Sequence, residues 1–148
     1  MNALRPILLA EDNPNDIELI LAALQEAHLA NEIVVARDGV EALDFLYRRG
    51  AHAGRTSPQP AVVLLDLKMP RIDGREVLRQ IRTDPQLHAL PIVVLTSSRE
   101  ESDLLQTYRL GVNAYVVKPV GFEEFISAVG KLGVFWALLN ESPAPPHA

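Results

Sequence analysis

The sequence predicts an α/β fold, a doubly wound three-layer sandwich in which a five-stranded parallel sheet lies between helices. Five short apolar runs rich in branched residues alternate with amphipathic helical patterns, at residues 7–10, 32–36, 61–65, 92–95 and 114–117. Continuously apolar strands are typical of parallel sheets that are covered by helices on both faces. Three of the runs are followed directly by charged residues, which indicates a single functional site at one edge of the sheet.

Size and composition limit the possible functions. The 148 residues suit one domain, and 48% hydrophobic with 22% charged residues is typical of globular proteins. A net charge of −5 is unfavourable for nucleic-acid binding, which needs a basic face. The absence of cysteine excludes disulfides and thiol chemistry, and the apolar start is too short for a signal peptide or membrane span. We therefore expect a cytoplasmic protein that binds neither nucleic acid nor membrane.

The first two helical patterns differ in how clearly their ends are marked. The first helix is expected to begin at Pro14, with Asn13 as N-cap and Asp16 in the positive first turn. Its apolar stripe consists of Ile17, Ile20, Leu21 and Leu24. The second helix carries Val40, Leu43 and Tyr47 and is expected to stop near Gly50, before an exposed loop over residues 50–60.

The remaining helices follow the third, fourth and fifth strands. The third follows Gly74 and ends before Asp84-Pro85, because a residue that precedes proline avoids helical geometry. The fourth has a narrow stripe of Leu104, Leu105 and Tyr108 before Gly111. The fifth carries Phe122, Phe125, Ile126 and Val129. We expect one domain over residues 1–140, with an extended last helix, and a flexible proline-rich tail over residues 141–148.

Polar side chains stand at the carboxyl ends of four predicted strands. In open parallel sheets, ligands bind outside these ends, where the strand order reverses. If the first strand lies between the second and third, in the order 2-1-3-4-5, these side chains converge from four strands. They are Glu11, Asp12, Asp66, Thr96 and Lys118.

This set of residues suits phosphoryl transfer. Clustered carboxylates repel one another, and Mg2+ relieves the repulsion while keeping waters for a phosphate. Asp66 can attack phosphorus to form an aspartyl phosphate, with Lys118, Thr96 and Mg2+ neutralising charge. Each residue alone also suits a structural role: Glu11, Asp12 and Thr96 as helix caps, Asp66 as a turn residue and Lys118 as a solvated lysine. Their shared position favours the phosphoryl-transfer interpretation, and a cis peptide before Pro119 could aim the lysine inward.

Several motifs occur in order along nearly the whole chain: Glu11-Asp12, Asp66-Leu67-Lys68-Met69-Pro70, Asp73-Gly74, Thr96-Ser97 and Lys118-Pro119. Together they resemble the receiver domains of bacterial response regulators, which have a flavodoxin-like fold. The long connector before the third strand and the stretch at residues 95–98 are most similar to the small regulators that are partnered with bacterial phytochrome histidine kinases. The resemblance implies a regulator of a two-component phosphorelay. Because the pattern of the fifth helix runs almost to the proline-rich tail, we expect a single-domain regulator with no effector domain after the receiver.

The resemblance also implies roles for individual residues. Asp66 would take a phosphoryl group from a phosphohistidine of a sensor histidine kinase. Asp12 would ligate Mg2+ directly, Glu11 would hold it through water, and the backbone carbonyl of Lys68 would complete the protein ligands. The protein would be a phosphoacceptor that assists its own phosphorylation and dephosphorylation, rather than an enzyme.

A second implied feature is a conformational switch. Thr96 and Tyr115 would form the switch pair, in which the hydroxyl moves to the phosphoryl group and the Tyr115 ring turns inward. The face of the fourth helix, fifth strand and fifth helix would then change. The apolar end of the chain predicts a homodimer through this face and the last helix, because exposed apolar patches mark interfaces. The apolar residues are Leu132, Val134, Phe135, Trp136, Leu138 and Leu139.

Two alternatives belong to other functional classes. A pseudo-receiver adaptor would bind a partner without phosphorylation, but the intact acidic pocket counts against it. An aspartate-nucleophile phosphatase of the haloacid dehalogenase type also uses an Asp and Mg2+ at strand ends. Such an enzyme needs a second Asp two residues after its nucleophile, and here that residue is Lys68.

Overall fold

The predicted parallel sheet is confirmed by a computed structural model, which describes residues 5–97, 100, 111–112 and 114–130. The strand order is β2-β1-β3-β4-β5, and every pair is parallel. The strands are β1 (Ile7–Ala10), β2 (Ile33–Ala36), β3 (Val62–Asp66), β4 (Ile92–Thr96) and β5 (Ala114–Val117). β1 and β3 therefore lie inside the sheet and are fully buried, as their unbroken apolar sequences require.

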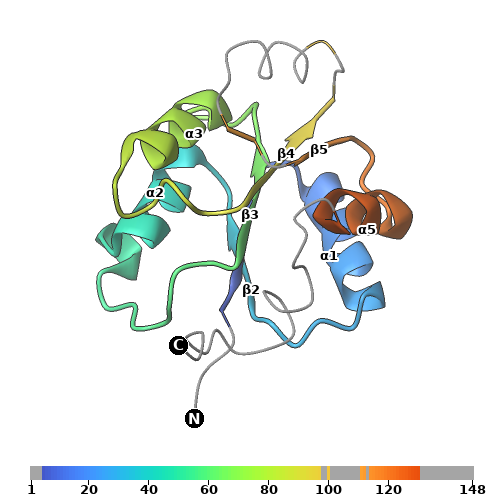
Figure 1. The fold of residues 1–148 in the computed structure, drawn as a ribbon, viewed down its shortest axis with the longest axis horizontal. Coiled ribbons are helices and arrows are strands. Elements are labelled where there is room, and N and C mark those ends of the chain that lie inside the picture. Colours follow the sequence, from blue (N-terminus) through green and yellow to red (C-terminus); the bar gives the residue numbers. More distant parts are fainter. Residues whose placement is uncertain (1–4, 98–99, 101–110, 113, 131–148) are drawn as a thin grey trace, which may run out of the picture.

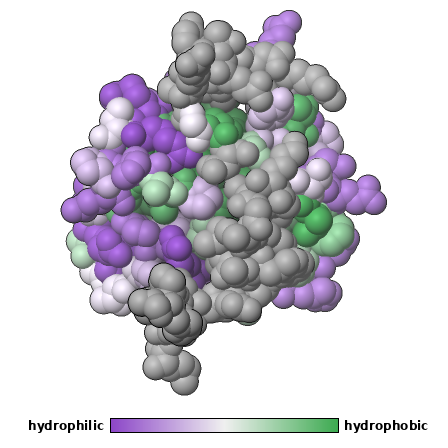
Figure 2. All heavy atoms as spheres, in the orientation of Figure 1, coloured by the Kyte–Doolittle hydropathy of each residue, from purple (hydrophilic) through white to green (hydrophobic). Residues whose placement is uncertain are grey.

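Helices cover both faces of the sheet (Figure 1). α1 (Pro14–Glu26) and α5 (Phe122–Gly130) lie on one face, and α2 (Gly39–Tyr47) and α3 (Gly74–Thr83) lie on the other. Successive strand residues point to opposite faces, so Ile7 and Leu9 pack toward α1 and α5, while Leu8 packs toward α2 and α3. The outer surface over α2 and α3 is mainly hydrophilic (Figure 2). The chain thus builds two apolar layers on one sheet.

The ends of the helices follow the sequence in two cases and depart from it in one. The Asn13 side chain caps α1 by accepting from the backbone N–H groups of Asn15 and Asp16. Thr83 ends α3 before Asp84-Pro85, as predicted. α2 ends earlier than Gly50, because Arg48 takes the left-handed conformation with φ 53°. A short 3-10 turn, η1 (Gly50–His52), follows it.

The connector between α2 and β3 is more ordered than the predicted exposed loop. The Arg55 guanidinium donates to the backbone oxygens of Phe45, Ser57 and Pro58 at 2.8 to 2.9 Å, and to Gln59 Oε1 at 2.7 Å. It also lies 4.0 Å above the centre of the Phe45 ring. A planar group with five donors can satisfy a loop that lacks secondary structure of its own, and here one arginine ties the connector to α2.

The strand register brings the strand ends to one edge of the sheet. Ala10 pairs with Leu65, Asp66 with Leu95, and Thr96 with Val117. Gly74 allows α3 to begin against the end of β3, because a Cβ at this position would lie 2.1 Å from the Asp66 carbonyl oxygen. The lack of a side chain at Gly74 thus permits the close packing beside Asp66.

Some predictions concern parts of the chain outside the described residues. These are the fourth helix with its apolar stripe, the apolar residues 132–139, and the domain limits at residues 140 and 141. Within the part that the structure describes, none of the helices has the length and apolar character needed to cross a membrane.

Candidate functional site

Three carboxylates meet at the carboxyl edge of the sheet. Glu11 and Asp12 follow β1, and Asp66 is the last residue of β3. One carboxylate oxygen from each lies within 4.8 Å of the others. Glu11 is 0% exposed and Asp66 is 4% exposed, whereas Asp12 faces solvent. The predicted acidic cluster therefore forms, with two buried acids, Glu11 and Asp66, and one acid, Asp12, exposed to solvent.

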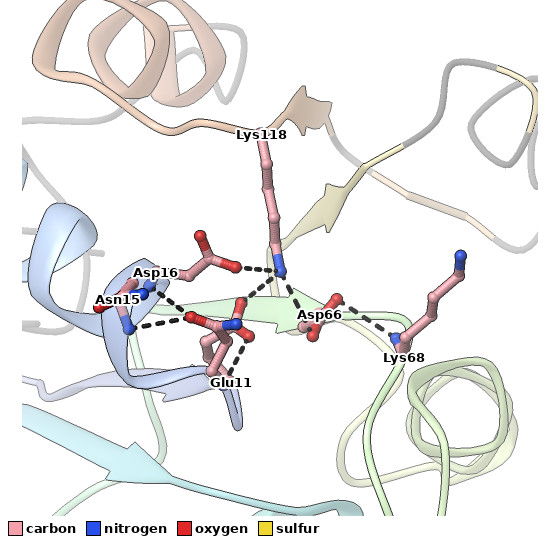
Figure 3. A network of polar contacts seen from close by, with 7 residues as sticks. Glu11, Asn15, Asp16, Asp66, Lys68 and Lys118 are labelled. Atoms are coloured by element: carbon pink, nitrogen blue, oxygen red, sulfur yellow. Dashed lines mark hydrogen bonds and ion pairs between the residues drawn. The ribbon is translucent and has the colours of Figure 1, made fainter.

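Lys118 enters this cluster from the end of β5 (Figure 3). Its ammonium Nζ lies 2.8 Å from Glu11 Oε1, 3.0 Å from Asp16 Oδ2 and 3.4 Å from Asp66 Oδ2. Its backbone N–H donates to the Thr96 carbonyl at 2.7 Å, and the peptide bond to Pro119 is cis. The side chain predicted to neutralise phosphate thus contacts the predicted phosphoacceptor.

Asp16 is the site residue that sequence reasoning missed. The sequence suggested only that its charge favours the first turn of α1, but its carboxylate also reaches Lys118. α1 begins three residues after Glu11, so its first turn lies beside the strand ends. An acid in that turn could have been recognised as a neighbour of the cluster from this spacing.

Burial and contacts with oppositely charged groups have opposing effects on the pKa values of Glu11 and Lys118. Burial, with a smaller effect from the charge of Asp66, raises the pKa of Glu11 to about 7, although hydrogen bonds from Lys118 and Asn13 oppose the rise. Burial alone lowers the pKa of Lys118, but the contacts with Glu11 and Asp16 raise it above its ordinary value. Lys118 therefore stays cationic beside several acids.

The loop after β3 is folded back against Asp66. Asp66 Oδ1 accepts from the backbone N–H of Lys68 at 3.2 Å. The Lys68 side chain is exposed and points away from the acids (Figure 3). Its ammonium group is therefore not part of the cluster, and the backbone of Lys68 is the part that lies next to Asp66.

The predicted switch residues lie on β4 and β5. Thr96 ends β4 and is 1% exposed, directly at the carboxyl edge. Tyr115 is half-buried on β5, in register with Val94, so it lies further from the edge than Thr96. A cavity of about 500 Å³ adjoins Tyr115 and the α5 residues Glu123, Glu124 and Ser127.

The donor set fits a hard divalent cation. Among the described residues, Glu11, Asp12 and Asp66 form the group of acids able to share one ion. Carboxylate and carbonyl oxygens are the ligands that Mg2+ and related ions prefer. Lys118 supplies one positive charge against the three acids that it contacts, so the excess negative charge also favours a cation.

Comparison with protein families and curated sequences gives one consistent result. The family model described as the response regulator receiver domain matches residues 7–130. The chain is 41% identical over 139 residues to the probable methanogenesis regulatory protein FilR2 of Methanothrix harundinacea, covering 94% of this chain and 88% of FilR2. It is 38% identical over 143 residues to the response regulator Rcp1 of Synechocystis, covering 97% and 96%.

Solved structures with the same fold include regulators from phytochrome systems. The bacteriophytochrome response regulator RtBRR has a TM-score of 0.88 and 55% identity, covering 97% of this chain and 86% of that one. The bacteriophytochrome response regulator AtBRR has a TM-score of 0.86 and 60% identity, covering 94% and 99%. The Mn2+-bound form of Rcp1 has a TM-score of 0.73 and 37% identity, covering 95% and 99%.

Proposed function

The chain belongs to the family of response regulator receiver domains and acts in a phosphorelay, and from this we propose that Asp66 is the residue that accepts the phosphoryl group. One observation carries this assignment. Asp66 ends a central strand, with a carboxylate oxygen within 4.8 Å of those of two further acids and 3.4 Å from the Lys118 ammonium. Nucleophile and charge-neutralising group are therefore within reach of one phosphoryl group.

The described residues divide the chemistry between them. An Asp66 carboxylate oxygen forms the bond to phosphorus as the bond from phosphorus to the kinase histidine nitrogen breaks. Lys118 neutralises negative charge on the phosphoryl oxygens, and the Thr96 hydroxyl donates to one of them. The buried floor around Glu11 limits access of bulk water to Asp66. Because Lys118 and Thr96 stabilise charge on phosphorus in either direction, the protein assists its own phosphorylation and, when water reaches the site as the acceptor, its own dephosphorylation, without turning over an external substrate.

We assign the divalent metal site to Asp12, Asp66, the Lys68 carbonyl and, through water, Glu11. Mg2+ is the proposed ion, and when bound it supplies positive charge next to the phosphoryl oxygens. Two observations support the assignment: the oxygen donors of the acid cluster, and the Mn2+-bound form of the relative Rcp1.

Asp12→Asn is expected to weaken Mg2+ binding strongly, because it removes a charged ligand at the solvent side of the site. The loss should exceed the roughly 10–100-fold that removal of an outer-shell partner costs. Calorimetric titration with Mg2+ measures it. Glu18→Gln removes the same charge from an exposed position on α1 and is the matched control. Equal Mg2+ affinity in Asp12→Asn and the parent chain would contradict the assignment.

We propose that Thr96 and Tyr115 transmit phosphorylation to the face of β5 and α5. Movement of the Thr96 hydroxyl toward the phosphoryl group leaves space on β4 for the Tyr115 ring. The ring borders the cavity beside α5, so its rotation changes the surface there. The phosphoryl group can favour this state only through contacts that it makes better in that state.

The expected donor is a sensor histidine kinase. The solved relatives RtBRR and AtBRR are named as bacteriophytochrome response regulators, and we propose that the kinase for this chain is of the bacteriophytochrome class. We place the exchange in the cytoplasm, since a chain without cysteine agrees with a reducing compartment.

A homodimer through the α5 face and the apolar residues 132–139 is the proposed assembly. Burial of large apolar side chains between two copies would remove them from water, which is the main driving force for such association. Light scattering over a concentration series, with and without phosphorylation, is expected to show a dimer in at least one state. A monomer at every concentration, with and without phosphorylation, would contradict the proposed dimer.

Intact-protein mass spectrometry tests the proposed function. The parent chain, incubated with Mg2+ and acetyl phosphate, is expected to gain the mass of one phosphoryl group. If the mass does not increase with acetyl phosphate or with a phosphorylated bacteriophytochrome kinase, the result would favour an adaptor that works without phosphorylation.

A further inference from the structure

Lys118 is shared among three acids in the resting site, and Asp16 is the one that no step of the proposed chemistry uses. We propose that Asp16 is a positioning residue that restrains Lys118, so that phosphorylation requires the ammonium to exchange Asp16 for a phosphoryl oxygen. This inference rests on the proposed function of Asp66. Asp16 would then influence both the rate at which Asp66 is phosphorylated and the lifetime of the aspartyl phosphate.

The distances show where the ammonium is held. Lys118 Nζ lies closer to Glu11 and Asp16, at 2.8 and 3.0 Å, than to Asp66, at 3.4 Å. An ammonium has three hydrogens, and the two shorter contacts each use one of them. In Figure 3 the lysine descends between Asp16 and Asp66, with the Asp16 carboxylate on the side away from Asp66. The third hydrogen is left for Asp66, but this contact is the longest of the three, so a close contact with a phosphoryl group on Asp66 competes with the Asp16 contact.

Burial decides which contact Lys118 gives up. The Glu11 side chain is 0% exposed, so loss of Lys118 would leave a buried carboxylate without a cation, held, among the described residues, only by the Asn13 backbone N–H. The Asp16 side chain is 25% exposed, so water can replace the ammonium there. Breaking the Asp16 contact is accordingly the less costly route to the phosphorylated state.

The local fold fixes Asp16 in this position. Its backbone N–H donates to Asn13 Oδ1 at 3.0 Å, in the cap of α1. The adjacent Ile17 is buried in the core that α1 shares with α5, so the first turn of the helix cannot move freely. The first turn of α1 therefore holds Asp16 in place beside Lys118. In the unphosphorylated protein Asp16 already occupies the ammonium for which a phosphoryl group would compete.

Asp16→Asn tests the inference, because asparagine keeps the size of the side chain but removes its charge. An ion pair that water partly reaches is weak, so its loss should change the rate by only about 5-fold. We expect acetyl phosphate to phosphorylate Asp16→Asn roughly 3–10-fold faster than the parent chain, and the aspartyl phosphate to persist longer. Asp16→Glu, which restores the charge, is expected to return both values toward those of the parent.

A second measurement reports on Lys118 without phosphorylation. Lys118 is one of three lysines in the sequence, so its side-chain ammonium resonance can be assigned by NMR with Lys118→Arg. Asp16→Asn is expected to shift this resonance, whereas Glu18→Gln, which removes an exposed charge two residues further along α1, should not. Thermal unfolding of both variants separates any general loss of stability from the effect on Lys118.

The two measurements keep this inference apart from the proposed function. If the parent chain is not phosphorylated, the proposed function fails, while the NMR comparison still decides whether Asp16 holds Lys118. The inference is overturned by an unshifted Lys118 resonance in Asp16→Asn, or by phosphorylation of that variant at or below the rate of Glu18→Gln.

Discussion

Asp66→Asn is expected to reduce phosphorylation to background while the fold is retained. The asparagine amide is not a nucleophile toward phosphorus, and Asp66 is a buried acid next to Lys118 that forms the last residue of the central strand β3. The folded state should not lose stability, because the change removes a negative charge from a site where the charge of Asp66 raises the pKa of Glu11. Intact mass after treatment with acetyl phosphate and Mg2+ measures the first effect, and chemical denaturation measures the second.

Asp73→Asn is the matched control for this variant. Asp73 lies at the end of the loop that follows Asp66, and its side-chain oxygen caps α3 by accepting from the Glu76 backbone N–H. Asparagine preserves a cap of this kind, so phosphorylation should continue as in the parent chain. A phosphoryl gain on Asp66→Asn equal to that of the parent would place the acceptor elsewhere and refute the assignment.

Lys118→Ala is expected to have two large effects of different origin. Loss of one preorganised group that stabilises developing charge costs roughly 10²–10³-fold in rate. Removal of the ammonium also leaves the buried Glu11 carboxylate without its cation, which should cost about 1–3 kcal/mol of stability in metal-free buffer. Mg2+ should recover part of that stability, because a divalent cation offsets the same excess of negative charge.

Urea denaturation with EDTA and with Mg2+, together with the rate of phosphorylation by acetyl phosphate, measures both effects. Lys118→Arg keeps the charge and serves as the comparison, with a smaller loss of stability than Lys118→Ala. If Lys118→Ala were phosphorylated as fast as the parent chain, Lys118 would not be the group that neutralises the phosphoryl oxygens.

Local sequence patterns were enough to predict the sheet and the reactive residues at its carboxyl edge. Unbroken apolar runs require burial on both faces, so the parallel sheet and its helical layers follow from local sequence alone. The same pattern placed Glu11, Asp66 and Lys118 at strand ends, because the last residue of an apolar run marks where a strand leaves the core. These three residues meet in the structure. Asn13 and Asp84-Pro85 marked helix ends correctly because capping and proline geometry act within a few residues.

The packing of distant elements sets which groups share Lys118 and how the connector after α2 is held. Asp16 looked like a helix-terminal acid, and its contact with Lys118 joins residues 102 positions apart in sequence. The Arg55 network and the left-handed Arg48 likewise depend on where the connector meets α2. Hydrophobic periodicity and capping are local signals, whereas the partner of a charged side chain depends on which elements the packed sheet brings together. The sequence therefore predicted the residues at the sheet edge, and the fold determined the distances that set their charge balance.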